Sequence, residues 1–316
     1  MPNIIELINL LRAEARVFIQ THNFPDHDAI ASAFALQELL NHFEIKSYIV
    51  YDGDIQRDSL KRMISILNIK ACNYTELSMK PEDKIIIVDG CKGNRNVFDL
   101  KGYEIAVIDH HEVICPEYIA FSDIRMDYGS CSTIIYTYYQ ELGIKISREA
   151  ATALMVGLSI DTALLTRSVS ETDINVYASL YVNANTTIVN SILRNYIKTE
   201  ELRFYRYAID NIRIRDCFAF CYFHHGCNQN LLGILSDFFL ALEEVNFVVL
   251  CAKNDDKINF SVRSELEQWN ASKIIQKVLK DIGFGGGHSD MAGGMIKNIN
   301  LFNENEIYEK FFNELT

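Results

Sequence analysis

Short apolar runs alternate with amphipathic segments through the first half of the chain. The runs are rich in β-branched residues and bounded by polar ones, which is typical of buried parallel strands. Four runs of this kind occupy residues 16–21, 47–51, 84–88 and 104–108. Apolar residues recur at helical spacing in residues 28–43, 59–67, 132–142 and 148–165. The alternation predicts an α/β domain in which a mostly parallel sheet is flanked by helices.

The pattern changes in the second half of the chain, where a polar helical stretch precedes a new group of strands. Strand-like segments occupy residues 218–223, 245–252 and 259–263, followed by a helix at 272–282, a glycine-rich loop and a terminal helix near 304–314. We expect three parts. They are an N-terminal α/β domain at residues 1–188, a helical linker at 189–214 and a smaller C-terminal α/β domain at 215–316.

Composition narrows the class of protein. The 316 residues are 49% hydrophobic and 23% charged, which suits two globular domains and excludes a disordered chain. The net charge of −12 disfavours binding to long duplex nucleic acid or to an anionic membrane, because both need many Lys and Arg side chains. Eight cysteines without a CxxC pair are typical of reduced thiols, so we expect a cytoplasmic protein.

Acidic and histidine side chains gather where the predicted strands end. They are His22, Asp26 and Asp28 after the first strand, Asp89 after the third, and Asp109, His110 and His111 after the fourth. Because the carboxyl ends of parallel strands lie along one edge of a sheet, we expect these side chains to converge there. Converging carboxylates and imidazoles suit divalent metal ions. A single aspartate at a strand end is often only a helix cap or turn residue, and the metal site is favoured because three strand ends share the pattern.

Asp161 adds an independent indication. It is the only charged residue in the apolar stretch 153–165, which is predicted to be helical. A buried carboxylate without a partner is costly, so a metal ion is the favoured partner and capping of the next segment is the alternative. His27 stands between two of the strand-end aspartates, and we expect it to face solvent or substrate.

These residues together resemble the DHH phosphoesterase superfamily. The motifs are HxxxDxD at residues 22–28, Val88-Asp89, the DHH triplet at 109–111 and the later Asp161. The GSCS segment at 129–132 is similar to a GSxS-type segment of that superfamily. In the second half, FSVRS at 260–264 and GGGHSDMAG at 285–293 resemble its associated C-terminal domain. The resemblance is strongest to the nanoRNase (oligoribonuclease) subgroup, which degrades very short RNA and dephosphorylates 3′-phosphoadenosine 5′-phosphate (pAp).

The resemblance implies two divalent ions, with Mn²⁺ preferred and Mg²⁺ or Co²⁺ as alternatives. One ion would be held by His22, Asp26 and Asp89, and the other by Asp28, Asp89, His110 and Asp161, with Asp89 bridging. The catalytic residues would be His111, Asp89 and Asp109. His111 would face the substrate phosphate, and Asp109 would support the histidines from behind.

In the C-terminal domain the resemblance implies a substrate-binding role for five residues. They are Ser261, Arg263, Gly286, Gly287 and His288. Backbone N–H groups of a glycine-rich loop can cradle a phosphate, and an arginine can grip a second phosphate or stack on a base. On spacing alone, a tight turn beside an exposed strand arginine is an equal alternative. We expect the active site in a cleft between the two domains.

The sequence thus predicts a metal-dependent hydrolase of short nucleotide phosphoesters. Its substrates would be very short oligoribonucleotides (nanoRNA), linear dinucleotides or pAp. The alternatives are a pyrophosphatase or exopolyphosphatase, and a non-catalytic nucleotide sensor with the same fold. Ala31, Ala163 and Met291 stand where the superfamily often has Gly, Gly and Ala, which affects the shape of the pocket and leaves the substrate open. Whether the chain forms a homodimer is also open.

Overall fold

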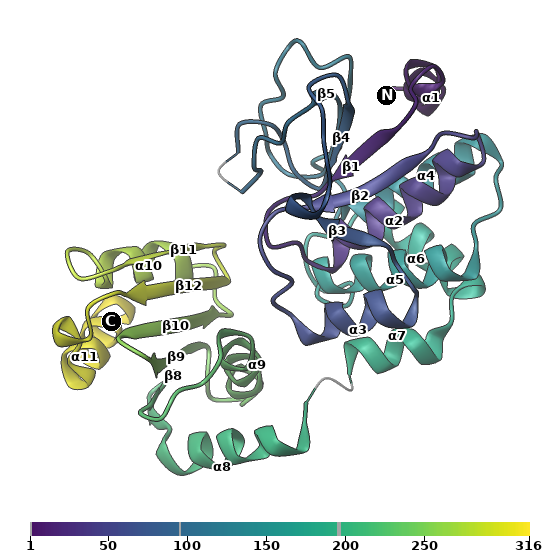
Figure 1. The fold of residues 1–316 in the computed structure, drawn as a ribbon. Coiled ribbons are helices and arrows are strands. Elements are labelled where there is room, and N and C mark those ends of the chain that lie inside the picture. Colours follow the sequence, from purple (N-terminus) through teal and green to yellow (C-terminus); the bar gives the residue numbers. More distant parts are fainter. Residues whose placement is uncertain (1, 95, 195–196) are drawn as a thin grey trace. The chain divides into compact units, whose positions relative to one another are not determined.

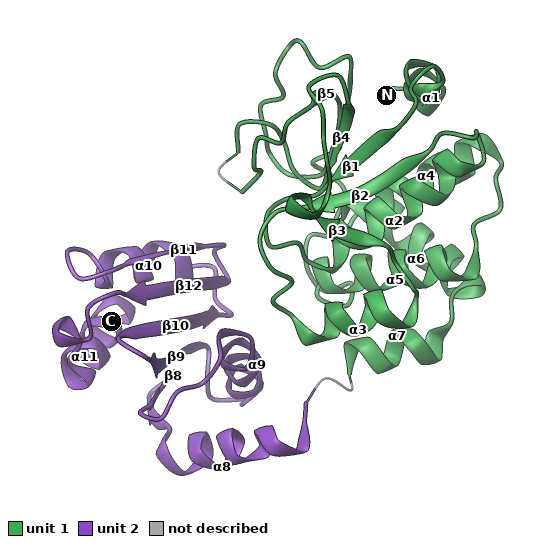
Figure 2. Cartoon of the chain, in the orientation of Figure 1, with its two compact units in different colours: residues 1–196 green, residues 197–316 purple. Residues whose placement is uncertain are grey.

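Two compact units make up the structure, a computed structural model that describes residues 2–94, 96–194 and 197–316. Residues 1–196 form the first unit and residues 197–316 form the second (Figure 2). The linker expected at residues 189–214 spans this boundary, and its residues 195 and 196 lie outside the described residues. The expected cleft between the domains stays a prediction.

A parallel sheet of six strands organises the first unit (Figure 1). Its strands are β1 (Val17–Gln20), β2 (Ser47–Tyr51), β3 (Ala71–Asn73), β4 (Lys84–Val88), β5 (Tyr103–Asp109) and β6 (Phe121–Ile124). They lie in the order β3-β2-β1-β4-β5-β6, and every neighbouring pair is parallel. The α/β fold is therefore confirmed, and it brings the carboxyl ends of all six strands to one edge.

The two faces of this sheet are covered differently. The helices of the unit are α1 (Ile4–Leu11), α2 (His27–Asn41), α3 (Asp58–Ile66), α4 (Cys131–Leu142), α5 (Arg148–Asp161), α6 (Glu171–Asn183) and α7 (Thr186–Leu193), with a short 3-10 helix η1 (Tyr74–Glu76). Strand residues such as Ile19 and Ile86 share one apolar core with these helices. On the opposite face, Phe18 and Ile87 pack against irregular connecting segments, for example at Leu100.

The helix predicted at residues 148–165 ends earlier, at Asp161. Ala163, Leu164 and Leu165 follow with left-handed backbones, at φ +47°, +61° and +64°. The Thr162 hydroxyl donates to a carbonyl of the last helical turn at 2.6 Å and accepts from the Leu165 N–H at 3.1 Å, which stabilises the turn that ends the helix. Asp161 therefore stands at the carboxyl end of α5 and not inside an apolar helix. Ala163 adopts a conformation that favours glycine.

A mixed sheet of six strands organises the second unit. Its strands are β7 (Arg213–Arg215), β8 (Phe218–Phe223), β9 (Phe247–Asn254), β10 (Lys257–Ser264), β11 (Phe284–Gly287) and β12 (Met291–Ile296), in the order β11-β12-β10-β9-β8-β7. Helices α10 (Ala271–Val278) and α11 (Glu304–Leu315) pack on one face, and α8 (Leu202–Asn211) and α9 (Gln229–Leu240) pack on the other. Two short 3-10 helices, η2 (Thr199–Glu201) and η3 (Ile299–Leu301), complete the unit. None of the helices in the described parts of the chain is long and apolar enough to cross a membrane.

The glycine-rich segment forms a β-hairpin, so the prediction of a loop is wrong. Gly285 pairs with Gly294, and Gly286 pairs with Gly293, across β11 and β12. A Cβ on Gly294 would come within 2.6 Å of Ile275 in α10 and 2.7 Å of Leu279 at its C-cap, so glycine allows this helix to pack closely on the hairpin. On the other face, a Cβ on Gly286 or Gly293 would meet nothing nearer than 3.6 Å, so a small side chain would fit at either position.

Candidate metal centre

Six side chains reach the carboxyl edge of the first sheet. They are His22 after β1, Asp26 at the N-cap of α2, Asp28 in the first turn of α2, Asp89 after β4, His110 after β5 and Asp161 at the end of α5. Their nitrogen and oxygen atoms form two groups of three, and within each group all ligand atoms lie within 4.8 Å of one another. One group is His22, Asp26 and Asp89, and the other is Asp28, His110 and Asp161. The structure thus brings together all six residues that the sequence predicts as metal ligands.

Asp89 lies between the two groups. Its Oδ2 is 3.6 Å from His22 Nε2, and its Oδ1 is 3.4 Å from His110 Nε2. The residue is 2% exposed, and its backbone is left-handed at φ +57°, a conformation that is costly for a residue other than glycine. The Asp89 N–H donates to the Ile108 carbonyl at 2.9 Å, which fixes this turn against the end of β5. Each carboxylate oxygen therefore faces a different group, as a bridging ligand requires.

The spacing of the other atoms also fits a metal ion. His22 Nε2 is 3.8 Å from Asp26 Oδ1, and His110 Nε2 is 3.1 Å from Asp161 Oδ2. Two ligand atoms that each lie about 2.1 Å from one ion are at most about 4.2 Å apart. Asp89 Oδ1 and His110 Nε2 are buried and have no hydrogen-bond partner among the described residues. Because such atoms are costly to bury, the set fits a divalent cation that both would bind.

The remaining nitrogen of each of these histidines faces a backbone carbonyl. His22 Nδ1 lies 2.9 Å from the Asn23 carbonyl, and His110 Nδ1 lies 3.2 Å from the Tyr128 carbonyl. A hydrogen on Nδ1 donates to the carbonyl and leaves the lone pair of Nε2 directed at the carboxylates. This is the tautomer that a ligand histidine needs.

Protons balance the charge of the metal-free cluster. Burial disfavours the charged rings, yet the attraction of the neighbouring carboxylates outweighs it and raises the pKa of His22 to about 10 and that of His110 to about 12. Burial, together with the charges of neighbouring carboxylates, raises the pKa of Asp28 and of Asp161. Carboxylates this close to one another need positive charge beside them. A divalent cation that binds here has to displace these protons.

Asp28 has a second partner that the sequence did not reveal. Its Oδ2 accepts from the Cys131 N–H at 2.7 Å, and its Oδ1 accepts from the Ser132 N–H at 3.0 Å, so it satisfies the first turn of α4. The close approach of α5 depends on Gly157, where a Cβ would lie 2.8 Å from Asp28 Oδ1. The GSCS segment marks the start of α4, since Ser130 is its N-cap. Its contact with Asp28 is a tertiary feature without a local signal.

Asp109 orients His111. Asp109 Oδ1 accepts a hydrogen bond from His111 Nδ1 at 2.8 Å and also from the backbone N–H of His110 at 2.8 Å. The Asp109 side chain is fully buried, whereas that of His111 is 47% exposed. The hydrogen bond to Asp109 raises the pKa of His111. With Nδ1 occupied, Nε2 is the atom of this ring that remains to contact a substrate.

His27 is 0% exposed, so the expectation that it faces solvent or substrate is wrong. Neither ring nitrogen has a hydrogen-bond partner among the described residues. Burial lowers the pKa of His27 to about 4, and the positive charge of Arg57 contributes, so the ring is neutral at neutral pH. Neighbouring positions of a helix point about 100° apart, and a residue between Asp26 and Asp28 therefore turns away from the cluster.

Two of the predicted substrate residues of the second unit, Ser261 and Arg263, contact α9. Arg263 Nε donates to an oxygen of Asp237 on α9 at 2.5 Å, and Arg263 Nη1 donates to the Ser261 hydroxyl at 3.2 Å. The Ser261 hydroxyl also accepts from the Ser236 hydroxyl at 3.0 Å, and Ser261 is 2% exposed. Ser261 therefore positions the arginine, and the Arg263 side chain, 13% exposed, is already partly neutralised by Asp237.

The glycine hairpin continues the same face of the sheet. Gly293 pairs with Ser261 on one side and with Gly286 on the other, so these three positions share a face. Gly287 has φ +143°, and a Cβ there would come within 2.5 Å of a carbonyl oxygen, so only glycine fits. His288 is exposed in the turn that follows. Ser261, Gly293 and Gly286 thus form one row across this face of the sheet.

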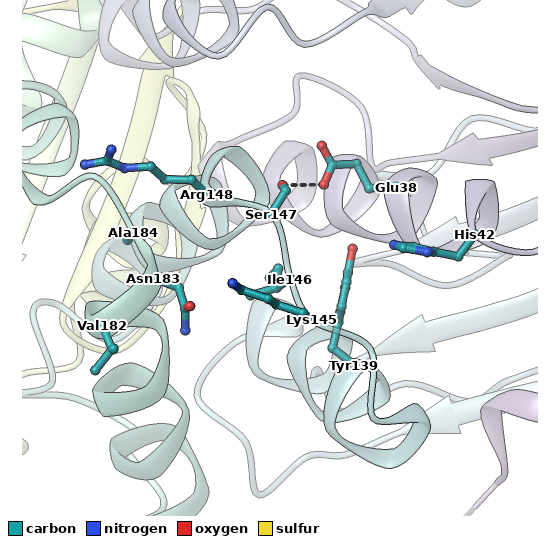
Figure 3. A pocket seen from close by; sticks show the side chains of 10 residues that line it. All are labelled: Glu38, His42, Tyr139, Lys145, Ile146, Ser147, Arg148, Val182, Asn183 and Ala184. Atoms are coloured by element: carbon teal, nitrogen blue, oxygen red, sulfur yellow. Dashed lines mark hydrogen bonds between the residues drawn. The ribbon is translucent and has the colours of Figure 1, made fainter.

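A cavity of about 590 Å³ lies elsewhere in the first unit (Figure 3). It is lined by Glu38, His42, Tyr139, Lys145, Ile146, Ser147, Arg148, Val182, Asn183 and Ala184. The Ser147 hydroxyl donates to Glu38 at 2.5 Å and joins α2 to the start of α5. Both helices begin or end at the candidate ligands and run about 20 Å to this cavity, so none of the predicted site residues lines it.

Three relatives are similar to the chain. An uncharacterized protein of Methanocaldococcus jannaschii is 31% identical over 286 residues, which cover 90% of this chain and 58% of that protein. A cyclic-di-AMP phosphodiesterase of Geobacillus thermodenitrificans is 25% identical, covering 93% of this chain and 47% of its own length. A probable manganese-dependent inorganic pyrophosphatase of Streptococcus thermophilus is 28% identical over 155 residues, covering 48% of this chain and 49% of that protein. The chain thus spans about half the length of each of these relatives.

A solved structure and two family models agree with the fold and with the sequence motifs of this chain. The crystal structure of an exopolyphosphatase-related protein from Bacteroides fragilis superposes with a TM-score of 0.79, at 18% identity, over 99% of this chain and 95% of that chain. Residues 16–158 match the N-terminal domain of the DHH family, and residues 215–315 match the DHHA1 domain. The chain therefore belongs to the DHH family, with a DHH domain in its first unit and a DHHA1 domain in its second.

Proposed function

We propose that this protein is a metal-dependent phosphoesterase whose substrates are short nucleotide phosphoesters. The observation that carries the proposal is the convergence of six ligand side chains on one sheet edge, with Asp89 between the two groups. A capping role explains Asp26 and part of Asp28, but it leaves Asp89 Oδ1 and His110 Nε2 buried without a hydrogen bond among the described residues. Divalent cations account for all six side chains together.

The candidate ligands divide between two ions. His22, Asp26 and Asp89 would hold one ion, and Asp28, Asp89, His110 and Asp161 would hold the other. When bound, the ions would supply a water of lowered pKa and positive charge for the phosphoryl oxygens. A mixture of imidazole nitrogen and carboxylate oxygen favours Mn²⁺ over Mg²⁺, which prefers oxygen alone, and Co²⁺ is compatible. The likeness to a relative named as manganese-dependent supports the same choice.

His111 and Asp109 would act on the substrate phosphate. The buried Asp109 carboxylate holds His111 Nδ1 and favours the protonated ring. The opposite nitrogen, Nε2, would donate a hydrogen bond to a non-bridging phosphoryl oxygen or a proton to the leaving oxygen. Asp109 positions this ring, and its own side chain is too buried to contact a substrate.

The second unit would hold the rest of the nucleotide. Arg263 offers a planar cation, and Gly286 and Gly287 belong to a glycine hairpin, followed by His288, whose backbone could approach a phosphate. The relative named as a cyclic-di-AMP phosphodiesterase covers both units of this chain, which supports a nucleotide phosphoester as substrate. Linear dinucleotides, nanoRNA and pAp are the members of this class that we propose to test.

Hydrolysis of pyrophosphate or polyphosphate is the second candidate function. It is favoured by the relative named as a pyrophosphatase, whose similarity covers 48% of this chain. The candidate ligands all lie in the first unit, so this chemistry would not need the glycine hairpin or Arg263. Nucleotide esters are preferred because the alternative gives the second unit no role.

A substrate panel in Mn²⁺ tests the proposal. The panel contains linear dinucleotides, oligoribonucleotides of two to five residues and pAp, beside pyrophosphate and polyphosphate, each at the same concentration. We expect a kcat/KM for at least one nucleotide ester that exceeds the value for pyrophosphate by about 100-fold or more. Preferential hydrolysis of pyrophosphate or polyphosphate would contradict the proposal, as would full activity after chelation of all divalent metal.

A further inference from the structure

Phe24 is an exposed aromatic residue in the short segment that joins two candidate metal ligands, His22 and Asp26. It stands two residues from His22 and two from Asp26, and each residue of chain spans at most about 3.6 Å. Its Cα therefore lies within about 7 Å of the Cα of both candidate ligands. The side chain is 50% exposed, which is uncommon for a phenylalanine and invites a functional explanation.

The ring of Phe24 is exposed but held in place. The backbone of Phe24 is left-handed, at φ +53°, a strained conformation for a bulky residue. Its N–H donates to the Asp52 carbonyl at 2.8 Å. Gly53 lies directly beneath the ring, since a Cβ there would come within 2.6 Å of two ring carbons. The loop after β2 thus supports one side of the ring and leaves the rest open to solvent.

The same segment is braced from the other side. The Asn23 N–H donates to the Asn96 carbonyl at 2.6 Å, and Asn23 Oδ1 accepts from the Phe98 N–H at 2.8 Å. Segments on both sides of β1 therefore fix the backbone on which Phe24 stands. A strained and well-supported backbone that displays an apolar ring beside polar ligands is typical of a binding site and not of a folding core.

Two other exposed rings of this unit, those of Phe98 and Tyr103, already have partners. Phe98 stacks on Tyr74 with 5.1 Å between the ring centres, and Lys84 lies over the ring of Tyr103 at 4.7 Å. No aromatic ring or cation pairs with Phe24 among the described residues. A single exposed ring is too small for a protein interface, but it suits stacking with one planar group.

We propose that Phe24 stacks against a base of the nucleotide whose phosphate reaches the metal centre. The proposal rests on the proposed function and adds a specificity-determining residue to it. An aromatic ring binds any base through its π-face, so Phe24 would favour nucleotide esters over inorganic phosphoanhydrides without selecting one base. The first unit would then contribute to substrate choice as well as to hydrolysis.

A matched pair of ligands tests this role without turnover. AMP and ribose 5-phosphate differ only in the base, and their affinities are measured by calorimetry in Mn²⁺ for the wild type, Phe24→Leu and Phe24→Tyr. Phe24→Leu keeps an apolar side chain over Gly53 but removes the ring. We expect it to weaken AMP about tenfold and ribose 5-phosphate less than twofold, and we expect Phe24→Tyr to bind both like the wild type. Tyr103→Leu, at the amino end of β5, is the control and should change neither affinity.

Equal losses for AMP and ribose 5-phosphate would show that Phe24 only supports the ligand loop, and no loss for either would show that the base lies elsewhere. Both results overturn the inference. Kinetics then separate it from the proposed function. If the wild type hydrolyses no nucleotide ester, the proposed function fails, and the affinity comparison still decides the role of Phe24. If the wild type hydrolyses nucleotide esters while Phe24→Leu keeps full AMP affinity, the inference alone fails.

Discussion

Charge balance is the main constraint on the candidate ligands at the scale of single residues. Asp28, Asp89 and Asp161 share one small volume with the two rings of His22 and His110. Without metal, protons on the imidazoles stabilise the carboxylates, which is why both histidine pKa values are raised. Protons and divalent ions therefore compete for the same atoms.

Metal affinity should depend on pH in a defined direction. Binding needs neutral imidazoles, and the pKa of His22 is about 10 and that of His110 about 12 in the metal-free protein. Each bound ion should thus expel about one proton or more, and the Mn²⁺ dissociation constant should fall roughly tenfold for each unit of pH between 6 and 8. Calorimetry at pH 7 in two buffers of different ionisation enthalpy measures the released protons. A pH-independent affinity would show that the histidines are not ligands.

At the scale of helices and strands, some features of the first unit could be predicted from the sequence and others could not. The strand ends could be predicted, because short apolar runs are followed directly by polar segments that contain His22, Asp89 and His110. In a parallel sheet, the carboxyl ends of these strands lie along the same edge. The end of α5 at Asp161 carried none, since Ala163 to Leu165 are ordinary helix formers that adopt left-handed backbones only in this tertiary setting. The burial of His27 was hidden for a similar reason.

The glycine hairpin shows a different limit of sequence reasoning. Glycine is depleted in strands, so a dense glycine segment is normally a loop. Here Gly294 is needed for the close approach of α10, and Gly293 faces the opposite side of the sheet. The two reasons cannot be told apart in the sequence, because both positions read as glycine.

Substitutions of two neighbouring glycines distinguish the packing role of Gly294 from the proposed binding role of Gly293. Gly294→Ala should destabilise the second unit by about 1–3 kcal/mol, because its Cβ would meet Ile275 of α10 at 2.6 Å and Leu279 at the C-cap at 2.7 Å. Gly293→Ala should leave the melting temperature within about 2 °C of the wild type but weaken nucleotide binding several-fold, because its methyl group would lie between the proposed substrate residues Ser261 and Gly286. Thermal melts and nucleotide affinity of both variants check this. Equal behaviour of the two variants would contradict the assignment of the two faces.

At the scale of the whole molecule, the two units would divide the work. The candidate ligands lie in the first unit, and Arg263 lies in the second. Contacts remote from the reacting phosphorus act only on substrates long enough to reach them. The DHHA1 domain should therefore matter for nucleotide substrates and be nearly silent for a minimal phosphoester.

Arg263→Ala should lower kcat/KM for a dinucleotide or pAp by about 10–100-fold, which corresponds to about 1.4–2.7 kcal/mol. Hydrolysis of p-nitrophenyl phosphate should change less than threefold or so. Arg206→Ala, which removes an exposed arginine of α8, serves as the control. An equal loss on both substrates would show that Arg263 supports the catalytic centre or the fold, and that the division of work is wrong.

The claim that one shared metal centre performs the hydrolysis is tested most directly at Asp89. Asp89→Ala and the control Asp54→Ala, an exposed aspartate after β2 that belongs to neither ligand group, are dialysed against Mn²⁺ and analysed for bound metal and for hydrolysis of the best nucleotide substrate. We predict two ions per chain in the wild type and in Asp54→Ala, with equal activity. Asp89→Ala should lose at least one ion and about 1000-fold or more in kcat/KM. An Asp89→Ala protein that binds two ions, or that keeps more than about a tenth of the activity, would contradict the account.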